Sequence, residues 1–204
     1  MLRVAVVLVC LVSVAGAAQK SEKTDTGSKS GQKSKSKSKS KKAKEEKRID
    51  IEGLVTAAPL PKDYEIKRQD IENEGKVLGY KLLLTNDDAL SKAIVSIENR
   101  KVSLRGEKVA ATKAYINGPA RTFAEAGLKL VDKKVPDLDK ADFDEPIVVD
   151  LVYEKEDGDR LLVQIRTFFT DVGHNVLVVA DSQDNYDLLT KWAKSVEGKP
   201  PEKK

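Results

Sequence analysis

The sequence has very few of the side chains on which most catalytic and metal centres depend. Its 204 residues include one Cys and one His, and aromatic residues make up 5% of the chain. One Cys cannot form an internal disulfide, and one Cys with one His cannot complete a known zinc cluster. The sequence also has neither a Gly-x-Ser-x-Gly segment nor a Gly-rich phosphate loop. We therefore expect a protein that is not an enzyme and that needs no cofactor.

The beginning of the chain has the pattern of a secretory signal peptide. Met1–Arg3 is a short cationic start, Val4–Val14 is almost entirely apolar, and Ala15–Ala17 has the small-x-small form of a cleavage site. The apolar stretch up to Ala18 has 15 residues, whereas a membrane-spanning helix needs about 20. We predict that residues 1–17 are a signal peptide, that the protein is secreted to an extracellular or periplasmic space, and that it is not transmembrane.

The net charge of +4 is divided unevenly along the chain. Residues 18–48 hold twelve Lys and Arg against four acids, which gives +8, and once Arg3 is also subtracted residues 49–204 carry −5. Between residues 27 and 44 no side chain is larger and more apolar than Ala43. Such a segment cannot bury enough surface to offset the entropy of ordering. We predict a disordered, basic Lys/Ser-rich arm over residues 18–48, attached to an acidic domain.

The centre of the arm alternates strictly between Lys and Ser, a pattern with two interpretations. It is either a solvated spacer or a contact for polyanions, since closely spaced lysines attract anionic groups. The expected partner is an unknown protein or an anionic surface of polysaccharide, mineral or lipid headgroups. Nucleic acid is not expected, because the chain is exported and the arm has no aromatic side chain for base stacking. The candidate polyanion-binding residues are Lys33, Lys35, Lys37, Lys39, Lys41 and Lys42, and the candidate phosphorylation sites are Ser34, Ser36, Ser38 and Ser40.

Alternating apolar side chains predict an antiparallel meander in the second half of the chain. Its strands are expected over residues 147–154, 161–167 and 176–180, with Gly-containing turns between them. A helix capped by Ser182 should follow, because its apolar residues then share one face. Trp192 lies on that face and is expected to anchor the helix on the sheet.

The first half of the domain has a less regular pattern. It predicts strands over residues 77–84 and 93–97 and two helical stretches over 106–116 and 119–127. The segment Asn117–Pro119 is expected to break the helix between these stretches, because Pro lacks a backbone N–H and fixes its own φ.

These elements predict an α+β fold over residues 49–197. In this architecture an antiparallel β-sheet is packed on one face by the C-terminal helix and the middle helical region. Gln164 and Arg166 alternate with apolar residues, which indicates that the other face is partly solvated. Residues 198–204 are expected to form a disordered tail.

The run Leu162–Val196, LVQIRTFFTDVGHNVLVVADSQDNYDLLTKWAKSV, resembles the closing strand–hairpin–strand–helix of the PsbP-like superfamily, which includes DcrB-type exported bacterial proteins. The resemblance covers about 35 residues of the chain. The aromatic-rich first strand of that superfamily and the Trp that follows it are missing here. The resemblance implies an α/β/α-like sandwich and an accessory or binding role without catalysis, and it brings no active-site residues with it.

Two groups of polar residues are left as candidate sites in the domain. His174 lies between Gly173 and Asn175, in what we interpret as an exposed hairpin turn and not as part of a catalytic triad. Acidic residues crowd one loop before the strand at 147, where a solvated acidic loop is favoured and a calcium site is the alternative, since Ca²⁺ binds oxygen ligands. The calcium candidates are Asp137, Asp139, Asp142 and Asp144.

Together these features predict a secreted, non-enzymatic binding or accessory protein whose partner is unknown. The alternative is an extracellular matrix or mineral-associated structural protein that uses the Lys/Ser-rich arm to bind polyanions. In low-complexity composition the arm resembles segments of mineral-associated matrix proteins.

Overall fold

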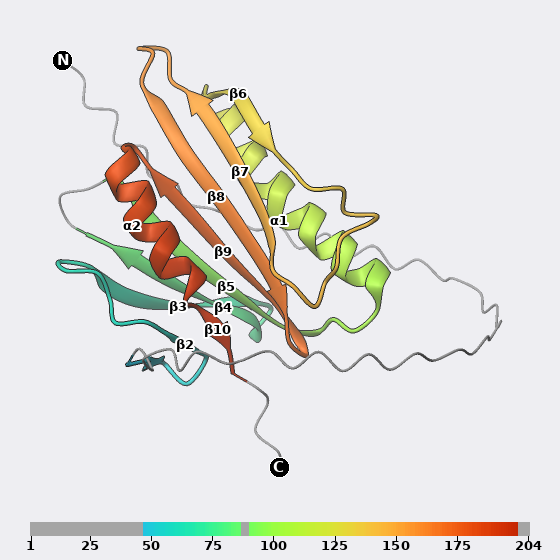
Figure 1. Ribbon diagram of the computed structural model, residues 1–204. Coiled ribbons are helices and arrows are strands. Elements are labelled where there is room, and N and C mark those ends of the chain that lie inside the picture. The colour runs from blue at the N-terminus through green and yellow to red at the C-terminus, as the bar shows by residue number, and fades with distance from the viewer. Residues whose placement is uncertain (1–46, 87–89, 200–204) are drawn as a thin grey trace, which may run out of the picture.

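The computed structural model describes residues 47–86 and 90–199. The signal peptide expected over residues 1–17 and nearly all of the arm lie outside these ranges. The described chain forms a mixed α+β fold around a seven-stranded antiparallel sheet with the order β3-β4-β5-β9-β8-β7-β6 (Figure 1). The strands are β3 (Glu65–Asn73), β4 (Lys76–Thr85), β5 (Lys92–Lys101), β6 (Lys129–Lys134), β7 (Ile147–Glu154), β8 (Arg160–Phe169) and β9 (Val172–Ala180). The antiparallel sheet and the α+β class agree with the sequence prediction.

The two described helices, α1 (Arg105–Glu125) and α2 (Gln183–Lys194), lie on opposite faces of this sheet. In Figure 1, α2 crosses in front of the strands and α1 lies behind them. Val176 and Val178 of β9 belong to the core under α2, whereas Leu177 and Val179 belong to the core under α1. The prediction that both helices cover one face was therefore wrong. The segment Val176–Ala180 of β9 is apolar at every position and buried throughout, and it needs cover on both sides because successive side chains of a strand point to opposite faces.

The face that carries Gln164 and Arg166 is also covered. These side chains are 6% and 9% exposed, because α2 and the chain that follows it lie over them. Arg166 donates to the backbone carbonyl of Val196 at 3.1 Å, and Gln164 donates to Asp150 at 2.9 Å. The prediction that this face is partly solvated was therefore wrong. Gln164 and Arg166 are buried polar residues that have hydrogen-bonding partners within the protein.

The C-terminal meander and helix follow the prediction closely. β7, β8 and β9 pair in sequence, and the Ser182 hydroxyl caps α2 by accepting from the backbone N–H of Asn185 at 3.4 Å. Trp192 is 4% exposed and packs in the core between α2 and the sheet. The expected anchoring role of Trp192 is confirmed.

The middle helical region is one continuous helix, so the expected break at Asn117–Pro119 was wrong. Tyr115 and Phe123 lie on either side of Pro119, and both are buried beneath α1. Their packing holds the helix on the sheet across the position where the proline removes one hydrogen bond. The Thr122 hydroxyl donates to the carbonyl of Gly118 at 3.2 Å, within the same turn.

A second, three-stranded sheet joins the two ends of the described chain. It consists of β1 (Ile49–Ile51), β2 (Val55–Ala57) and β10 (Glu197–Gly198) in the order β1-β2-β10. Arg48 donates to the carbonyl of Ser195 at 2.6 Å, and Lys199 forms an ion pair with Asp50. Arg48, Gly198 and Lys199, which flank the predicted domain of residues 49–197, thus contact the folded chain. None of the helices in the described ranges combines the length and apolar character needed to cross a membrane.

Candidate functional site

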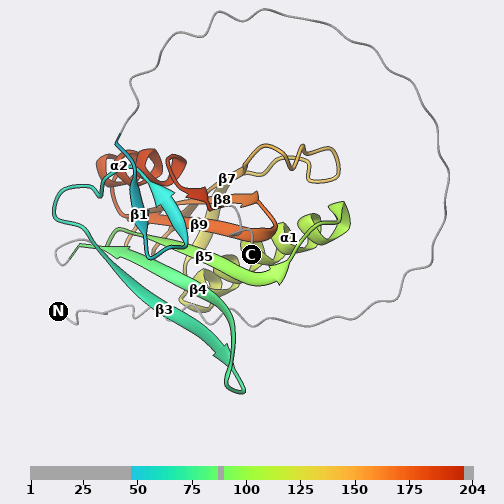
Figure 2. The same ribbon diagram turned by 90° about the horizontal axis from the view of Figure 1, so that it is seen from below.

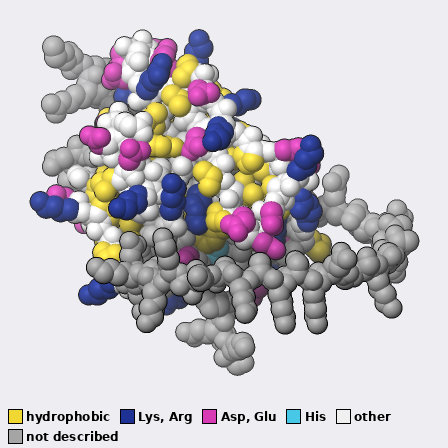
Figure 3. All heavy atoms as spheres, in the orientation of Figure 1, with side chains coloured by type: hydrophobic (Ala, Val, Ile, Leu, Met, Phe, Trp, Pro, Cys, Tyr) yellow, Lys and Arg dark blue, Asp and Glu magenta, His cyan; other side chains and the backbone are white. Residues whose placement is uncertain are grey.

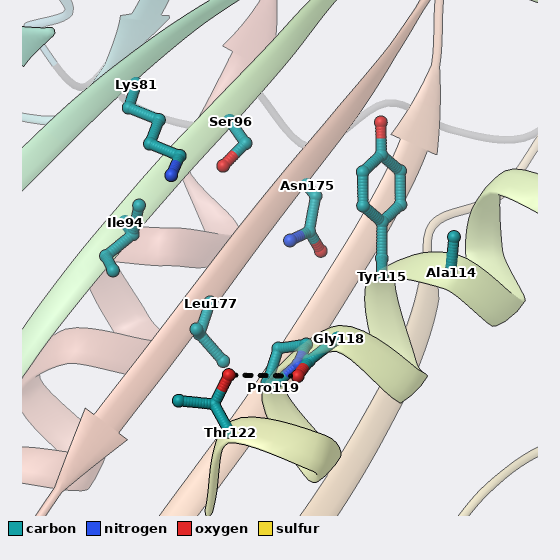
Figure 4. Close-up of a pocket in the computed structure, with 10 residues that line it drawn as sticks. All are labelled: Lys81, Ile94, Ser96, Ala114, Tyr115, Gly118, Pro119, Thr122, Asn175 and Leu177. Atoms are coloured by element: carbon teal, nitrogen blue, oxygen red, sulfur yellow. Dashed lines mark hydrogen bonds between the residues drawn. The ribbon is translucent and has the colours of Figure 1, made fainter. Parts of the chain in front are cut away.

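A groove runs between α1 and the strands β4 and β5. α1 packs on β6, β8 and β9, while β3 and β4 extend away from both helices (Figure 2). The groove contains a hollow of about 50 Å³ at the point where α1 meets the sheet. We call this site the α1 groove; its lining residues, drawn in Figure 4, are Lys81, Ile94, Ser96, Ala114, Tyr115, Gly118, Pro119, Thr122, Asn175 and Leu177.

The floor of the α1 groove is a row of polar side chains set across neighbouring strands. Lys81 of β4 lies opposite Ser96 of β5, Ser96 lies opposite Asn175 of β9, and Asn175 lies opposite Thr167 of β8. Directly opposite partners in antiparallel strands point to the same face. The register therefore brings four polar residues, one from each of four strands, into one line on the α1 side of the sheet.

An apolar row runs beside the polar one. It consists of Leu83, Ile94, Leu177 and Ile165, which are opposite one another in the same four strands. Ile94, Leu177 and Ile165 are buried against α1 in one core cluster. On this face the floor thus changes from apolar to polar between neighbouring rows of side chains. The buried apolar row fixes the position of the polar row beside it.

Two donors of the polar row face the groove without a hydrogen bond to another described residue. The Asn175 side chain is 5% exposed, and its Oδ1 accepts from the Thr167 hydroxyl at 3.5 Å. Neither Asn175 Nδ2 nor Ser96 Oγ forms a hydrogen bond to another described residue. Both atoms are also in contact with solvent, because neither is one of the fully buried polar atoms that lack a partner. Figure 4 shows the amide nitrogen of Asn175 directed toward Ser96. Both groups are therefore available to a ligand in the hollow.

One end of the α1 groove is closed by a hydrogen bond between Tyr115 and Glu98. The Tyr115 hydroxyl donates to the Glu98 carboxylate at 2.5 Å, and Arg100 lies 3.7 Å from the same carboxylate. Burial, with the negative charge of Glu98 as a second cause, raises the pKa of Tyr115 far above its ordinary value. The phenol stays protonated at neutral pH and serves as a fixed donor. Gly173 leaves room for it, since an added Cβ there would lie 2.9 Å from the Tyr115 oxygen.

The helical wall of the α1 groove is low because its residues are small. Ala114 and Gly118 are one turn apart and both are exposed, and Pro119 lies beside them. An added Cβ at Gly118 would meet no atom within 4 Å. An extended chain could therefore lie along this part of α1 and still place a side chain in the hollow.

No protein-family model, curated protein or solved structure matches this chain. The resemblance of Leu162–Val196 to the PsbP-like superfamily consequently rests on the sequence pattern alone.

His174 does not lie in an exposed turn, and that prediction was wrong. It is part of β9, is 1% exposed, and stacks on Phe168 with ring centroids 4.8 Å apart. Its Nε2 lies 3.0 Å from the Thr170 hydroxyl, and burial lowers its pKa to about 4. Gly173 and Asn175, which suggested a turn, are paired strand residues, and the chain reverses one step earlier at Thr170 and Asp171. His174 faces the α2 side, away from the α1 groove.

The acidic loop between β6 and β7 uses its carboxylates to order its own backbone. Asp137 accepts from the N–H of Asp139 at 3.1 Å, and Asp142 accepts from the N–H of Asp144 at 2.9 Å. Asp137 also pairs with Lys140 at 3.3 Å. Within residues 47–86 and 90–199, no three His, Cys, Asp or Glu side chains come together as a potential metal site. The four calcium candidates are therefore not brought together.

The polyanion and phosphorylation candidates of the arm, between residues 33 and 42, lie outside the described residues.

On the α2 side, Tyr186 donates a hydrogen bond to Asp150 at 2.8 Å. Burial is the main cause that raises the pKa of Tyr186, and this hydrogen bond is the second. Acidic, basic and hydrophobic side chains are interspersed on that face (Figure 3). Val148 and Leu188 remain exposed there.

Proposed function

We propose that this protein is an exported, non-enzymatic binding or accessory protein and that the α1 groove is its recognition site. The observation that carries the proposal is the pair of groove-facing donors, Asn175 Nδ2 and Ser96 Oγ. Buried polar groups in folded proteins are nearly always hydrogen-bonded. A largely buried amide with a free donor, at the bottom of an open hollow, therefore favours a site that is completed by a ligand.

The size of the hollow favours a protein partner over a small molecule. Sites for drug-sized ligands and cofactors have volumes of about 300–1,000 Å³, whereas this hollow has about 50 Å³. One side chain of a partner fits such a volume. The rest of the partner would then lie over Ala114 and Gly118 on the low wall of the groove.

The titratable groups with the largest pKa shifts support binding more than catalysis. Tyr115 and Tyr186 keep their protons because burial raises their pKa, and His174 stays neutral because burial lowers its pKa. General acid–base catalysis near neutral pH works best with a pKa near 7. Tyr115, the one of these three that lines the α1 groove, is a hydrogen-bond donor to Glu98 and not an acid of that strength.

We also propose that the fold is a PsbP-like sandwich. The proposal is supported by the seven-stranded sheet between α1 and α2 and by the closing order β8, β9 and α2. In this proposal the protein shares an architecture associated with accessory roles, and the α1 groove is its own feature.

A photo-crosslinking side chain placed at Ala114 tests the recognition site. The mature protein carrying it is incubated with the extracellular fraction of its source, and a second protein carries the same group at Lys191, which is exposed on α2. We expect a defined adduct from position 114 and none of the same mass from position 191. Equal adducts at both positions, or none at position 114, would contradict the assignment of the site.

A second candidate function is a matrix or mineral-associated protein that binds polyanions through its arm. The observation in its favour is the separation of charge, with +8 in residues 18–48 against −5 in residues 49–204. In this function the arm would bind the polyanion, and the folded domain would be attached to it through the arm.

A further inference from the structure

We propose that the α1 groove binds the carboxylate of an acidic side chain in an extended segment of a partner protein, through Lys81, Ser96 and Asn175. This inference rests on the proposed function, since it names the chemistry that the groove selects. It is carried by the donors that the sheet register brings together.

All three groups offer hydrogens to a ligand. Lysine has donors and no acceptor, and a serine hydroxyl and an asparagine Nδ2 can both donate. The Thr167 hydroxyl occupies Oδ1 of Asn175 at 3.5 Å, which leaves Nδ2 as the end of the amide that faces Ser96 (Figure 4). A site with one cation and two neutral donors matches an ionised carboxylate, which is an acceptor at both oxygens.

The charges on the α1 side of the strands favour an anion. Lys92 lies two residues before Ile94 on the same side of β5 as Ser96, and Lys81 lies opposite Ser96. The nearest acid in the same strand, Glu98, already accepts from Tyr115 and lies close to Arg100. Its charge is thus partly offset at the closed end of the groove. Lys81 and Lys92 thus place two positive charges on the same side of the sheet as Ser96.

The dimensions of the site select a carboxylate attached to a longer chain. A hollow needs about 10–15 Å³ of space to hold one water molecule, so this hollow of about 50 Å³ holds a group the size of a few water molecules, such as the carboxylate end of an acidic side chain. The remainder of the ligand must lie outside the hollow. Ala114 and Gly118 leave space there for an extended backbone, which a free small acid would not use.

The test follows the side-chain amide resonances of Asn175 in the ¹⁵N-labelled mature protein. The titrants are a blocked pentapeptide with one glutamate among alanines, the same peptide with glutamine, and acetate. We expect a saturable shift with the glutamate peptide and little shift with the glutamine peptide. Losing one charge-assisted hydrogen bond should weaken binding by about tenfold, so Lys81→Gln and Ser96→Ala should each move the midpoint by this factor. Lys191→Gln removes a lysine from α2 and should leave the midpoint unchanged.

The outcomes separate the inference from the proposed function. If Asn175 responds equally to glutamate and glutamine peptides, or to neither, the carboxylate assignment is wrong. If acetate binds as tightly as the glutamate peptide, the assignment to a protein segment is wrong and a free acid is the ligand. Crosslinking from position 114 that is unaffected by Lys81→Gln would leave the recognition site in place and overturn only the carboxylate chemistry. Because Lys81→Gln alters a half-exposed side chain, the test does not depend on a change in the buried Asn175.

Discussion

The imidazole of His174 is packed between the Phe168 ring and Gly198, and its Nδ1 has no hydrogen bond to any described residue. An added Cβ at Gly198 would lie 2.5 Å from Nε2 and 2.8 Å from Cε1, so the glycine allows β10 to pass close to these two ring atoms. Burial lowers the pKa of His174 from 6.5 to about 4, because a charged ring would lose its hydration there. The small sheet at the chain ends is thus packed on a neutral histidine.

We predict that the free energy of unfolding decreases as the pH is lowered from about 6.5 toward 4. In this range the unfolded chain binds a proton at His174 that the folded protein does not, so acid favours unfolding. A shift from 6.5 to about 4 corresponds to a loss of about 2 kcal/mol by pH 5 and about 3 kcal/mol at the end of the range. Urea unfolding at a series of pH values measures this loss.

His174→Gln is the matched control for the acid effect. Its amide can still reach the Thr170 hydroxyl, and it does not titrate. The stability of the natural protein relative to His174→Gln should decline as the pH falls from about 7 to about 5, whereas effects of carboxylates cancel between the two proteins. A constant difference over this range would show that His174 is not the group responsible.

At the scale of elements, two glycines have opposite roles in α1 and β4. Gly118 is in an exposed helical position with open space around its Cα, whereas a Cβ at Gly79 would collide with the backbone carbonyl of Ile97 in β5. We predict that Gly118→Ala raises the free energy of unfolding by about 0.5–1 kcal/mol, because alanine loses less entropy in a helix. We predict that Gly79→Ala lowers it by about 1–3 kcal/mol, as overpacked cores do.

Urea unfolding of both variants measures these changes, and each serves as the control for the other because the substitution is the same. If Gly79→Ala were as stable as the natural protein, the close approach of β4 to β5 would not hold in solution. A loss of stability in Gly118→Ala would mean that α1 is not regular at that position.

The elements that could be predicted from the sequence are those with a strong apolar pattern. β7, β8, the Val176–Ala180 part of β9 and α2 bury regular sets of side chains, and their patterns are sufficient to predict them. β3 and β6 are the two edge strands of the sheet and are almost entirely exposed. They consist mostly of charged residues, as edge strands often do, so no apolar alternation marked them.

The α1 groove could not be predicted from the sequence, because its polar row depends on strand order. Lys81, Ser96 and Asn175 meet only because β5 pairs with β9, although α1 and three strands lie between them in the chain. Local patterns do not determine such a pairing. The local sequence around Asn175 predicts a turn, since Gly173, two residues before it, is a typical turn residue. The continuous helix through Pro119 was missed for a related reason, as tertiary packing outweighs the local preference.

At the scale of the whole molecule, the arm and the domain can be separated by experiment. The experiment is a deletion of residues 18–46. The deletion keeps Arg48, because the Arg48 side chain donates hydrogen bonds to the backbone carbonyls of Thr56 and Ser195. If the arm binds polyanions, we predict that the deletion abolishes retention on an anionic polysaccharide at low ionic strength. We also expect retention of the full chain to decrease steeply with added salt, because binding releases counterions.

The control for this deletion keeps the length of the arm and replaces its six lysines between residues 33 and 42 by glutamine. It should lose retention as well, since the charge is responsible. Retention that is unchanged by either variant would contradict the matrix function and leave the α1 groove as the site of binding.

The small sheet of β1, β2 and β10 determines how the molecule would respond to a pulling force. A partner that held the arm would pull at residue 47, directly before Arg48 and β1. β1 has three residues and pairs with β2 alone, so tension would peel this short ribbon before it reached the seven-stranded sheet. The weakest sheet would thus yield first, and the α1 groove, on the far side of the large sheet, would keep its shape under load.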